Sequence, residues 1–496
     1  MPSDISRRGF LKLSSAFAAL SVTSRASSET LARATGEDRL ISASALTDLR
    51  QSLSGSLITP GDTGYELMYL PNNLVYRGIK PIGIAICKNE DDIAKSLRWC
   101  RKHNVNLITR NGGHSYAGYS TTRGLMINTQ ALNSITYDKS REEVRIGAGA
   151  NNGQIYDALE PINRTLTHGR CLGVGVGAFL LGGGVGFNMR RFGVGSDLVT
   201  QTEMVLADGL FVRANKAENP DLFWAIRGAG GGNLGINTSF NVSVFPADRI
   251  VIFKINWSNV SDAFLQNMFS VLESSPRALG HQIYLRPEDI NGKSSAISAY
   301  MFGQFAGSLQ DFNEIISQIN SIKPPYASTI EYLPYWEGQR LISDAGAPAY
   351  YRLRSRFINS TITESIISVI RKNLGGWKNK DGNGYLKLYQ TGGAVNDLLS
   401  QETAFVHRDS QWMADVSIDW KGDQSKNSIN KAQIWQDRLY AEITRLAGGG
   451  AYQNFVDRSL NDWEYSYYGK NITRLRAIKQ QVDPLNVFHF QQSIKA

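Results

Sequence analysis

Arg110-Asn-Gly-Gly-His-Ser115 and Cys171-Leu-Gly-Val-Gly-Val-Gly177 are the stretches that decide the fold of this chain. The first follows a predicted strand over 106–110 and presents consecutive backbone N–H groups without bulky side chains, an arrangement suited to a pyrophosphate. The second continues into Gly182-Gly-Gly-Val-Gly186, and together they form a loop able to lie flat against a large ligand. The apolar run Phe179-Leu-Leu181 favours a buried, ordered loop over a flexible turn.

A third glycine stretch, Gly230-Gly-Gly-Asn-Leu-Gly235, matches the dinucleotide fingerprint G-x-G-x-x-G. That fingerprint has physical meaning only between a strand and the helix that it opens. Here a helical pattern over 221–227 comes first and a strand pattern over 236–245 follows, so the sequence argues against a Rossmann nicotinamide site. The sequence also contains no G-x-x-x-x-G-K-[ST] motif, which removes the common nucleotide hydrolases.

The composition is that of a globular protein with several domains. Of the 496 residues 42% are hydrophobic and 20% charged, and at about 150 residues per domain this predicts two to four domains. Beyond the N-terminus no stretch approaches the roughly 18 apolar residues of a membrane span, so no stable membrane insertion is expected. The net charge is +9, but the basic residues are scattered and no nucleic acid partner is expected. Three cysteines and six histidines show no metal-ligand spacing, so no metal site is predicted.

The N-terminus has the pattern of an export signal. Ser6-Arg-Arg-Gly-Phe-Leu-Lys12 precedes a short apolar run over 13–22, and small residues follow at 26–28. This order resembles a bacterial twin-arginine signal, which makes 1–28 a signal peptide and predicts a periplasmic or extracellular protein. The twin-arginine export machinery would then be a transient partner. That route carries folded proteins, often with a cofactor already bound. The alternative is a basic amphipathic helix.

Two regions with different secondary-structure patterns follow the N-terminus. In the first, a helix over 90–103 is expected after the cap Asn89, and a hairpin over 203–213 is expected to hold Asp208-Gly209 in a primed turn. From about residue 250 the pattern is that of a separate α+β domain. The other predicted elements are, before 246, strands near 82–87, 106–110, 125, 135 and 144 and a helix over 153–160, and, after it, strands near 250–256, 281–286, 296–303, 384–390 and 411–420 and helices near 260–274, 308–321 and 427–447.

Six motifs together resemble one flavoprotein family. They are Arg110-Asn-Gly-Gly-His-Ser-Tyr-Ala-Gly-Tyr-Ser120, Gly169-Arg-Cys-Leu-Gly-Val-Gly175, Gly182-Gly-Gly-Val-Gly186, Asn219-Pro-Asp-Leu-Phe-Trp-Ala-Ile-Arg-Gly228, Tyr452-Gln-Asn-Phe-Val-Asp457 and Asp483-Pro-Leu-Asn-Val-Phe488. From about residue 65 onward the chain resembles the berberine bridge enzyme-like branch of the vanillyl-alcohol oxidase / p-cresol methylhydroxylase flavoprotein superfamily. The resemblance implies an α+β fold with a two-subdomain FAD-binding domain, formed by residues 65–246 and completed by 451–496. An α+β substrate domain with an antiparallel sheet, residues 247–450, is inserted between these parts.

The resemblance also implies a bound FAD cofactor. In bicovalent members of the family the flavin is joined at its 8α carbon to the His of Gly-Gly-His-Ser and at C6 to the Cys of the second loop. Those residues are His114 and Cys171 in this chain. Cys87, in an apolar strand, and Cys100, in a helix, are expected to be structural. The further residues expected to bind the cofactor are Arg110, Asn111, Gly112, Gly113, Ser115, Gly175, Gly177, Gly182, Gly183, Gly186, Ile236, Asn454 and Asn486.

The implied chemistry needs a base, because a flavin accepts hydride from a substrate C–H while the substrate hydroxyl loses its proton. Family patterning in the strand that ends at Trp420 points to Asp415. Many relatives carry a longer Gln or Glu there, and a Lys where this chain has Met413, so the reach of Asp415 stays open. Other members use an ionised tyrosine, and the tyrosines at matching positions here are Tyr116, Tyr389 and Tyr452.

The resemblance assigns a role in oxygen access to Val174, three residues after Cys171. In this family the side chain at that position sits over the flavin where O2 approaches; Val leaves room and Leu blocks it. The remaining histidines have no identifiable partner in the sequence and are expected to be structural: His103, His168, His281, His407 and His489.

The sequence thus predicts an exported FAD-dependent oxidase that oxidises an alcohol of a carbohydrate, or of an aromatic or other secondary metabolite. O2 would accept the electrons and become H2O2, and the partners would be the small-molecule alcohol and O2. Two alternatives stay open. One keeps the flavin in an oxidative cyclase or dehydrogenase of specialised metabolism, and the other is a flavin-bearing binding protein without turnover.

Overall fold

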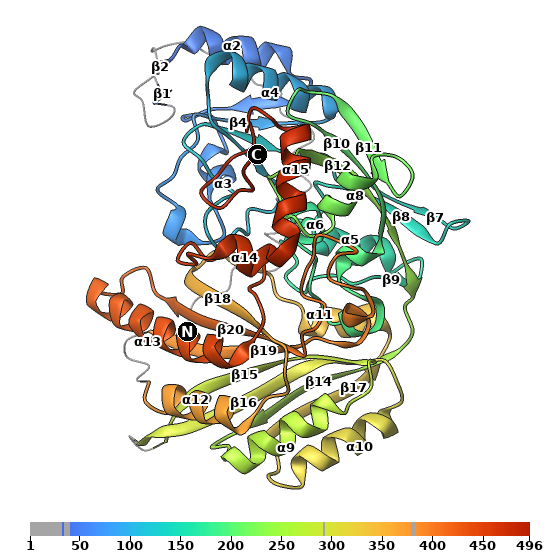
Figure 1. The fold of residues 1–496 in the computed structure, drawn as a ribbon, viewed down its shortest axis with the longest axis vertical. Coiled ribbons are helices and arrows are strands. Elements are labelled where there is room, and N and C mark those ends of the chain that lie inside the picture. Colours follow the sequence, from blue (N-terminus) through green and yellow to red (C-terminus); the bar gives the residue numbers. More distant parts are fainter. Residues whose placement is uncertain (1–31, 34–39, 291–292, 378–381) are drawn as a thin grey trace.

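The computed structural model describes residues 32–33, 40–290, 293–377 and 382–496 (Figure 1). The predicted twin-arginine signal lies outside the described residues. Three larger sheets organise the chain, two of them before residue 246 and one after it. No helix in the described part of the chain has the length and hydropathy of a membrane-spanning segment. The two small strand pairs are β1 (Ala32–Arg33) with β2 (Leu40–Ile41), and β9 (Arg164–Thr165) with β13 (Phe245–Pro246).

The first sheet has four strands in the order β3-β4-β6-β5, of which β4, β6 and β5 run parallel. Helix α4 (Glu90–His103) packs on it and begins after Asn89, whose side chain accepts a hydrogen bond from the Asp92 backbone N–H (2.9 Å); the predicted helix and cap are confirmed. Strand β5 ends at Arg110, so the first glycine loop leaves from the carboxyl edge of the parallel strands. The other elements are α2 (Ala43–Ser52), β3 (Ser56–Ile58), α3 (Tyr65–Tyr69), η2 (Leu74–Tyr76), β4 (Gly83–Ile86), β5 (Leu107–Arg110) and β6 (Leu125–Asn128).

The second sheet has five antiparallel strands in the order β11-β10-β12-β8-β7. Helix α6 (Val176–Leu181) contacts β12 and begins directly after Gly175, so the second glycine loop is anchored on this sheet. Residues Gly182–Gly184 are buried, as expected for an ordered loop. The other elements are β7 (Ile135–Asp138), β8 (Glu143–Gly147), α5 (Asn152–Leu159), α7 (Met189–Phe192), η3 (Gly195–Leu198), β10 (Val199–Val205), β11 (Phe211–Asn215), α8 (Pro220–Ile226) and β12 (Ile236–Ser243).

The hairpin predicted over 203–213 is present as β10 and β11, but its turn is not the primed turn predicted. The backbone N–H of Gly209 donates to the Leu206 carbonyl (2.9 Å), so Ala207 and Asp208 occupy the centre of the turn. Neither has the positive φ that a primed turn requires, whereas Gly209 has φ 90°. Gly209 therefore follows the turn in the position of a bulge glycine.

The third sheet has seven antiparallel strands in the order β17-β14-β16-β15-β19-β20-β18. Helices cover one of its faces (Figure 1), where alternate apolar side chains form a separate core. The prediction missed two strands here, β17 and β18, two α-helices, α11 and α12, and the short helix η5. The bounds are β14 (Ile250–Trp257), α9 (Asp262–Glu273), β15 (Leu279–Ile290), β16 (Lys293–Phe305), α10 (Leu309–Asn320), β17 (Ala327–Leu333), α11 (Tyr335–Ile342), β18 (Tyr350–Ile358), α12 (Glu364–Leu374), β19 (Asn383–Gln390), η5 (Gly393–Asp397), β20 (Trp412–Trp420) and α13 (Lys426–Ala447).

The segment after α13 returns to the first part of the chain. It forms α14 (Trp463–Tyr468), η6 (Gly469–Asn471) and α15 (Ile472–Val482), and α15 packs against α8 (Figure 1). Lys479 and Asp483 form an ion pair (2.6 Å) whose side chains are both fully buried. The same ammonium donates to the backbone carbonyls of Asn233 (2.8 Å) and Phe488 (2.7 Å). The C-terminal segment thus holds the third glycine stretch in place.

Candidate active site

A cavity of about 600 Å³ lies between the glycine loops and the face of the seven-stranded sheet that the helices leave uncovered. Its walls include residues of the loop 111–116 after β5, of 171–179 around the start of α6, and of the third glycine stretch. Strands β15, β19 and β20 contribute the opposite wall. The cavity therefore brings the glycine-rich part of the chain and the sheet of the second part to one site.

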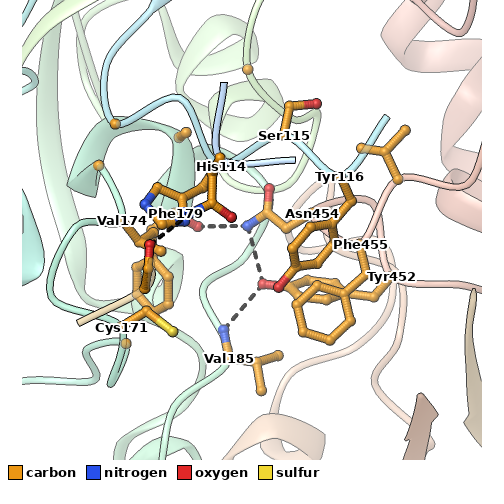
Figure 2. A pocket seen from close by; sticks show the side chains of 18 of the residues that line it. His114, Ser115, Tyr116, Cys171, Val174, Phe179, Val185, Tyr452, Asn454 and Phe455 are labelled. Atoms are coloured by element: carbon orange, nitrogen blue, oxygen red, sulfur yellow. Dashed lines mark hydrogen bonds between the residues drawn. The ribbon is translucent and has the colours of Figure 1, made fainter. Parts of the chain in front are cut away.

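Figure 2 shows how predicted site residues surround this cavity. One side carries His114, Cys171 and Val174, and the other side carries Tyr116, Tyr452 and Phe455.

The first two glycine loops pack against each other through their backbones. A Cβ on Gly112 would lie 2.5 Å from both the carbonyl oxygen of Gly173 and the backbone nitrogen of Gly175, so no side chain fits there. The Asn111 side chain donates to the Ala148 carbonyl and fixes the start of the first loop. Main-chain groups therefore form this part of the cavity wall.

His114 and Cys171 lie close together on the cavity wall. A Cβ on Gly346 would be 3.0 Å from Cε1 of His114 and 3.7 Å from Cβ of Cys171, so one small residue contacts both. Burial, followed by the charge of Arg110, lowers the pKa of His114 to about 4, which leaves its imidazole neutral at neutral pH. Burial raises the pKa of Cys171, and the Arg170 guanidinium opposes that rise.

Most of the residues predicted to bind the cofactor line the cavity. They are His114, Cys171, Asn111, Gly112, Gly113, Ser115, Gly175, Gly177, Gly186, Ile236 and Asn454. Four others do not reach the wall: Arg110, Gly182, Gly183 and Asn486.

Arg110 supports the first loop from behind. Its guanidinium donates to the backbone carbonyls of Tyr69 (2.7 Å) and Leu70 (2.5 Å), and a Cβ on Gly113 would lie 2.5 Å from that guanidinium. Arginine at the end of a buried strand therefore ties two segments together here and does not face the cavity.

The other three predicted residues do not reach the cavity wall because of their local contacts. Gly182 packs against the side chain of Asn454, and Gly183, with φ 111°, packs against the ring of Phe405. Asn486 lies in the turn after α15, where its φ is 50° and its backbone N–H donates to the Asp483 carbonyl (3.0 Å). These residues shape the loops that carry the wall.

Asp415 lies on the cavity-facing side of β20 but does not reach the cavity. Its carboxylate accepts hydrogen bonds from Nζ of Lys387 (2.9 Å) and Oγ of Ser417 (2.6 Å), and its side chain is fully buried. Lys387, the register partner of Asp415 on β19, keeps 14% of its side chain exposed and lines the cavity. Asp415, predicted as a candidate base, therefore contacts the cavity-lining Lys387 and does not itself line the cavity.

The three predicted tyrosines line the cavity but differ in their hydroxyl contacts. The Tyr452 hydroxyl accepts hydrogen bonds from the backbone N–H groups of Gly184 (2.9 Å) and Val185 (3.1 Å) and from Nδ2 of Asn454 (3.1 Å) (Figure 2). The Tyr116 and Tyr389 hydroxyls make no hydrogen bond within the described part of the chain. The Tyr452 hydroxyl thus stabilises the loop at Gly184 and Val185, whereas the hydroxyls of Tyr116 and Tyr389 are available to a substrate.

The sequence analysis missed several cavity residues, most of them on the seven-stranded sheet. The missed wall residues are Tyr284 on β15, Tyr385 and Lys387 on β19, Tyr351 on β18, and Arg170 beside Cys171. The alternation in Tyr385-Leu-Lys-Leu-Tyr389 carried a usable signal, because residues two apart on a strand share a face. Of the histidines read as structural, His168 and His281 also border the cavity. Nε2 of His168 lies 2.7 Å from the Tyr335 hydroxyl.

Two family descriptions match separate parts of the chain. Residues 81–215 match the FAD binding domain family, and residues 451–495 match the berberine and berberine-like family. Both matched parts are similar to berberine bridge enzyme-like flavoproteins. The chain is an FAD-linked oxidoreductase.

Relatives of this chain include bacterial and fungal oxidoreductases. It is 29% identical over 456 residues to an uncharacterised FAD-linked oxidoreductase of Bacillus subtilis, YgaK, covering 90% of this chain and 98% of the relative. It is 28% identical over 442 residues to a glucooligosaccharide oxidase of Sarocladium strictum, covering 82% of this chain and 86% of that enzyme.

Solved structures show the same fold. BBE-like 1 of Physcomitrella patens is similar with a TM-score of 0.81 at 26% identity, covering 90% of this chain and 98% of that one. Glucooligosaccharide oxidase of Acremonium strictum, whose flavin is 6-S-cysteinyl, 8α-N1-histidyl FAD, is similar with a TM-score of 0.81 at 22% identity, covering 91% of this chain and 99% of that one.

The residues around the cavity fit a bound FAD. Oδ1 of Asn111 and Oγ1 of Thr109 are buried without a hydrogen-bond partner among the described residues, and both side chains belong to the wall. Buried polar atoms of this kind are satisfied in native proteins by a partner, here a ligand. Around Gly230–Gly232 a Cβ would meet no atom closer than 3.6 Å, so this backbone is open to a neighbouring group.

Proposed function

We propose that this berberine bridge enzyme-like protein is an exported oxidase that holds FAD through both His114 and Cys171. It oxidises an alcohol of a carbohydrate, or of an aromatic or other secondary metabolite, and passes the electrons to O2 to give H2O2. The observation that carries the proposal is the cavity in which the two attachment residues face tyrosines and Lys387. The oligosaccharide oxidases among the relatives support a carbohydrate, and Ser6–Lys12 supports export.

When bound, FAD supplies the hydride acceptor. The chain's own residues would hold it: the backbone N–H groups of the paired glycine loops would bind the pyrophosphate, and His114 and Cys171 would fix the flavin ring. The sheet wall combines aromatic rings with a few polar groups, which is the usual lining of a site that encloses a small polar molecule.

Tyr389 is the residue we assign as the base. Its free hydroxyl takes the proton of the substrate alcohol, while the ammonium of Lys387, two residues before it on the same face of β19, favours the ionised phenol. Burial raises the pKa of Tyr389, and the charge of Lys387 opposes that rise. The carboxylate of Asp415 keeps Lys387 charged despite its burial.

The proposal is tested by screening sugars and aromatic alcohols for peroxide release, followed by anaerobic mixing with each hit. An oxidase bleaches the flavin band with substrate and recovers it in air. Bleaching without recovery in air favours a dehydrogenase or a cyclase that uses another acceptor. A flavin that no alcohol bleaches identifies a binding protein and overturns the oxidase assignment.

Acid precipitation is expected to leave the wild-type polypeptide yellow, because covalent bonds survive unfolding whereas noncovalent contacts do not. His114→Ala and Cys171→Ala should each keep flavin through the remaining bond, and the double variant should release all of it. The absorbance of pellet and supernatant measures the attached fraction. A colourless wild-type pellet would show that the flavin is not covalently held.

Val174→Leu is expected to slow reoxidation of the reduced flavin by at least about tenfold, roughly 1.4 kcal/mol of barrier. The added methylene fills close-packed space on the predicted path of O2 to the flavin. Reduction by substrate should change little. Stopped-flow measurement of the two half-reactions separates the effects, and equal slowing of both would mean that Val174 only packs against the ring.

A further inference from the structure

One segment from the second part of the chain contacts both attachment loops. Residues Ser343–Ala349, here called the clasp, connect α11 to β18. At its start, the Asp344 backbone N–H donates to the Arg170 carbonyl (3.0 Å), and the Leu172 backbone N–H donates to the Asp344 carbonyl (2.8 Å). These two hydrogen bonds lie on either side of Cys171, so the clasp fixes the backbone that carries the thiol.

The far end of the clasp reaches the loop of His114 through Asn72. The Ala349 backbone N–H donates to the Asn72 carbonyl (3.0 Å), and the Asn72 backbone N–H donates to the Gly113 carbonyl (3.0 Å). The Asn72 side chain donates to the Gly346 carbonyl (2.7 Å) and accepts a hydrogen bond from the Tyr351 hydroxyl (2.8 Å). The clasp is thus connected by hydrogen bonds to both attachment loops.

Gly346, in the middle of the clasp, lies beside the two side chains themselves. Its φ is 68°, and a Cβ there would lie 3.0 Å from Cε1 of His114 and 3.7 Å from Cβ of Cys171. A Cβ on Gly173 would lie 3.0 Å from Nε2 of the same imidazole. The two glycines therefore lie against the Cε1–Nε2 edge of His114, where a larger residue would displace the ring.

We propose that the clasp is a positioning element for covalent flavin attachment, which sets the His114 ring and the Cys171 side chain in the places where both bonds form. This inference rests on the proposed attachment of FAD at both residues. Because the clasp joins α11 to β18, attachment would also require that the seven-stranded sheet is already in place.

Both attachment reactions are oxidations, and O2 is the oxidant. At His114 an N–C8α bond forms while the imidazole N–H and one C–H bond of the 8α methyl group break. At Cys171 an S–C6 bond forms while the thiol S–H and the C6–H bond break. Each reaction releases two protons and two electrons, which reduce one O2 to H2O2. The clasp takes no part in these electron transfers and acts by geometry alone.

The test compares Gly346→Val and Gly346→Asn with a control in the same segment, Ala345→Val, whose side chain is exposed. Asn tolerates a positive φ, so it adds bulk against His114 and Cys171 with little backbone strain. A fourth variant, Asn72→Ala, removes the hydrogen bond to the Gly346 carbonyl without adding atoms. All are produced as full chains with the wild type, and peptide mass analysis gives the fraction carrying flavin at each residue.

Both Gly346 variants are expected to lower the doubly attached fraction at least about tenfold, since a misplacement of about 1 Å costs about 100-fold in rate at a reacting centre. Their noncovalent flavin content should stay close to the wild-type total, and Asn72→Ala should lower attachment at His114. Ala345→Val should match the wild type. Wild-type attachment in Gly346→Asn and Asn72→Ala would overturn the role of the clasp, even if Gly346→Val fails to fold. A wild type without covalent flavin would instead overturn the proposed attachment itself.

Discussion

Tyr389→Phe should slow reduction of the flavin by substrate about 100- to 10,000-fold, the usual contribution of a positioned general base. The change removes one oxygen and keeps the ring, so the packing of Tyr389 against Phe455 (ring centroids 6.1 Å apart) is retained. Substrate binding and reoxidation by O2 should change little. Anaerobic stopped-flow measurement with an alcohol identified in the peroxide screen gives the rate of the reductive step.

The pH dependence of the same step tests the partnership with Lys387. The base works when its phenol is ionised, so the rate rises as the pH passes upward through the pKa of Tyr389. The ammonium of Lys387 lowers that pKa, against the effect of burial. Lys387→Met should therefore move the rising limb to higher pH and reduce the rate at neutral pH, whereas Lys387→Arg should restore much of it.

A matched control is Tyr385→Phe, which removes the hydroxyl of the tyrosine four residues earlier on the same face of β19. Tyr385 lines the same cavity and also feels the charge of Lys387. An equal loss of the reductive rate in Tyr385→Phe and Tyr389→Phe would assign the effect to the general polarity of the wall. If Tyr116→Phe abolishes flavin reduction while Tyr389→Phe stays active, Tyr116 is the base.

Lys479→Met is expected to lower the free energy of unfolding by about 3–5 kcal/mol, because it leaves the carboxylate of Asp483 buried without its partner. The ammonium donates to that carboxylate and to two backbone carbonyls inside the C-terminal segment and the third glycine stretch. Flavin retention should fall together with stability in the His114→Ala, Cys171→Ala background. Denaturant unfolding measures the first effect and ultrafiltration of the flavin measures the second.

The exposed Lys495 provides the control, since Lys495→Met removes a nearby charge without uncovering a buried one. Adding Asp483→Asn to Lys479→Met should recover part of the lost stability, because no unpaired charge then stays buried. The Asp483 carboxylate also accepts hydrogen bonds from the backbone N–H groups of Val487 and Phe488. A double variant less stable than the single one would show that these two hydrogen bonds are the main contribution of the carboxylate to stability.

Local chemistry made the glycine loops predictable. The sequence around His114 and Cys171 shows where side chains are excluded, and the structure brings both loops to one cavity. The sequence does not show which strands are neighbours. Lys387 and Asp415 are 28 residues apart and meet only because β19 and β20 pair in register, so Asp415 looked like a free carboxylate. The clasp was hidden for the same reason, since its contacts join segments distant in sequence.

Motif membership also did not show which direction a side chain takes. Arg110 and Asn486 both belong to motifs of the family, yet one points away from the cavity and the other sits in a turn after α15. A motif shows that a residue type is required at a position. The reason can be a hydrogen bond that stabilises a loop as well as a contact with a ligand.

The hold of the C-terminal segment on Asn233 constrains the order of events during synthesis. Lys479 is 246 residues from Asn233, whose backbone carbonyl accepts a hydrogen bond from its Nζ. Ile494, whose backbone N–H donates to the Asn233 side chain, is 261 residues from it. The ribosome delivers the glycine stretch well before these distant partners, and closing so long a loop carries an entropic cost. We therefore expect a nascent chain to pass most of its translation unable to retain FAD, and capture of the cofactor to be a post-translational step.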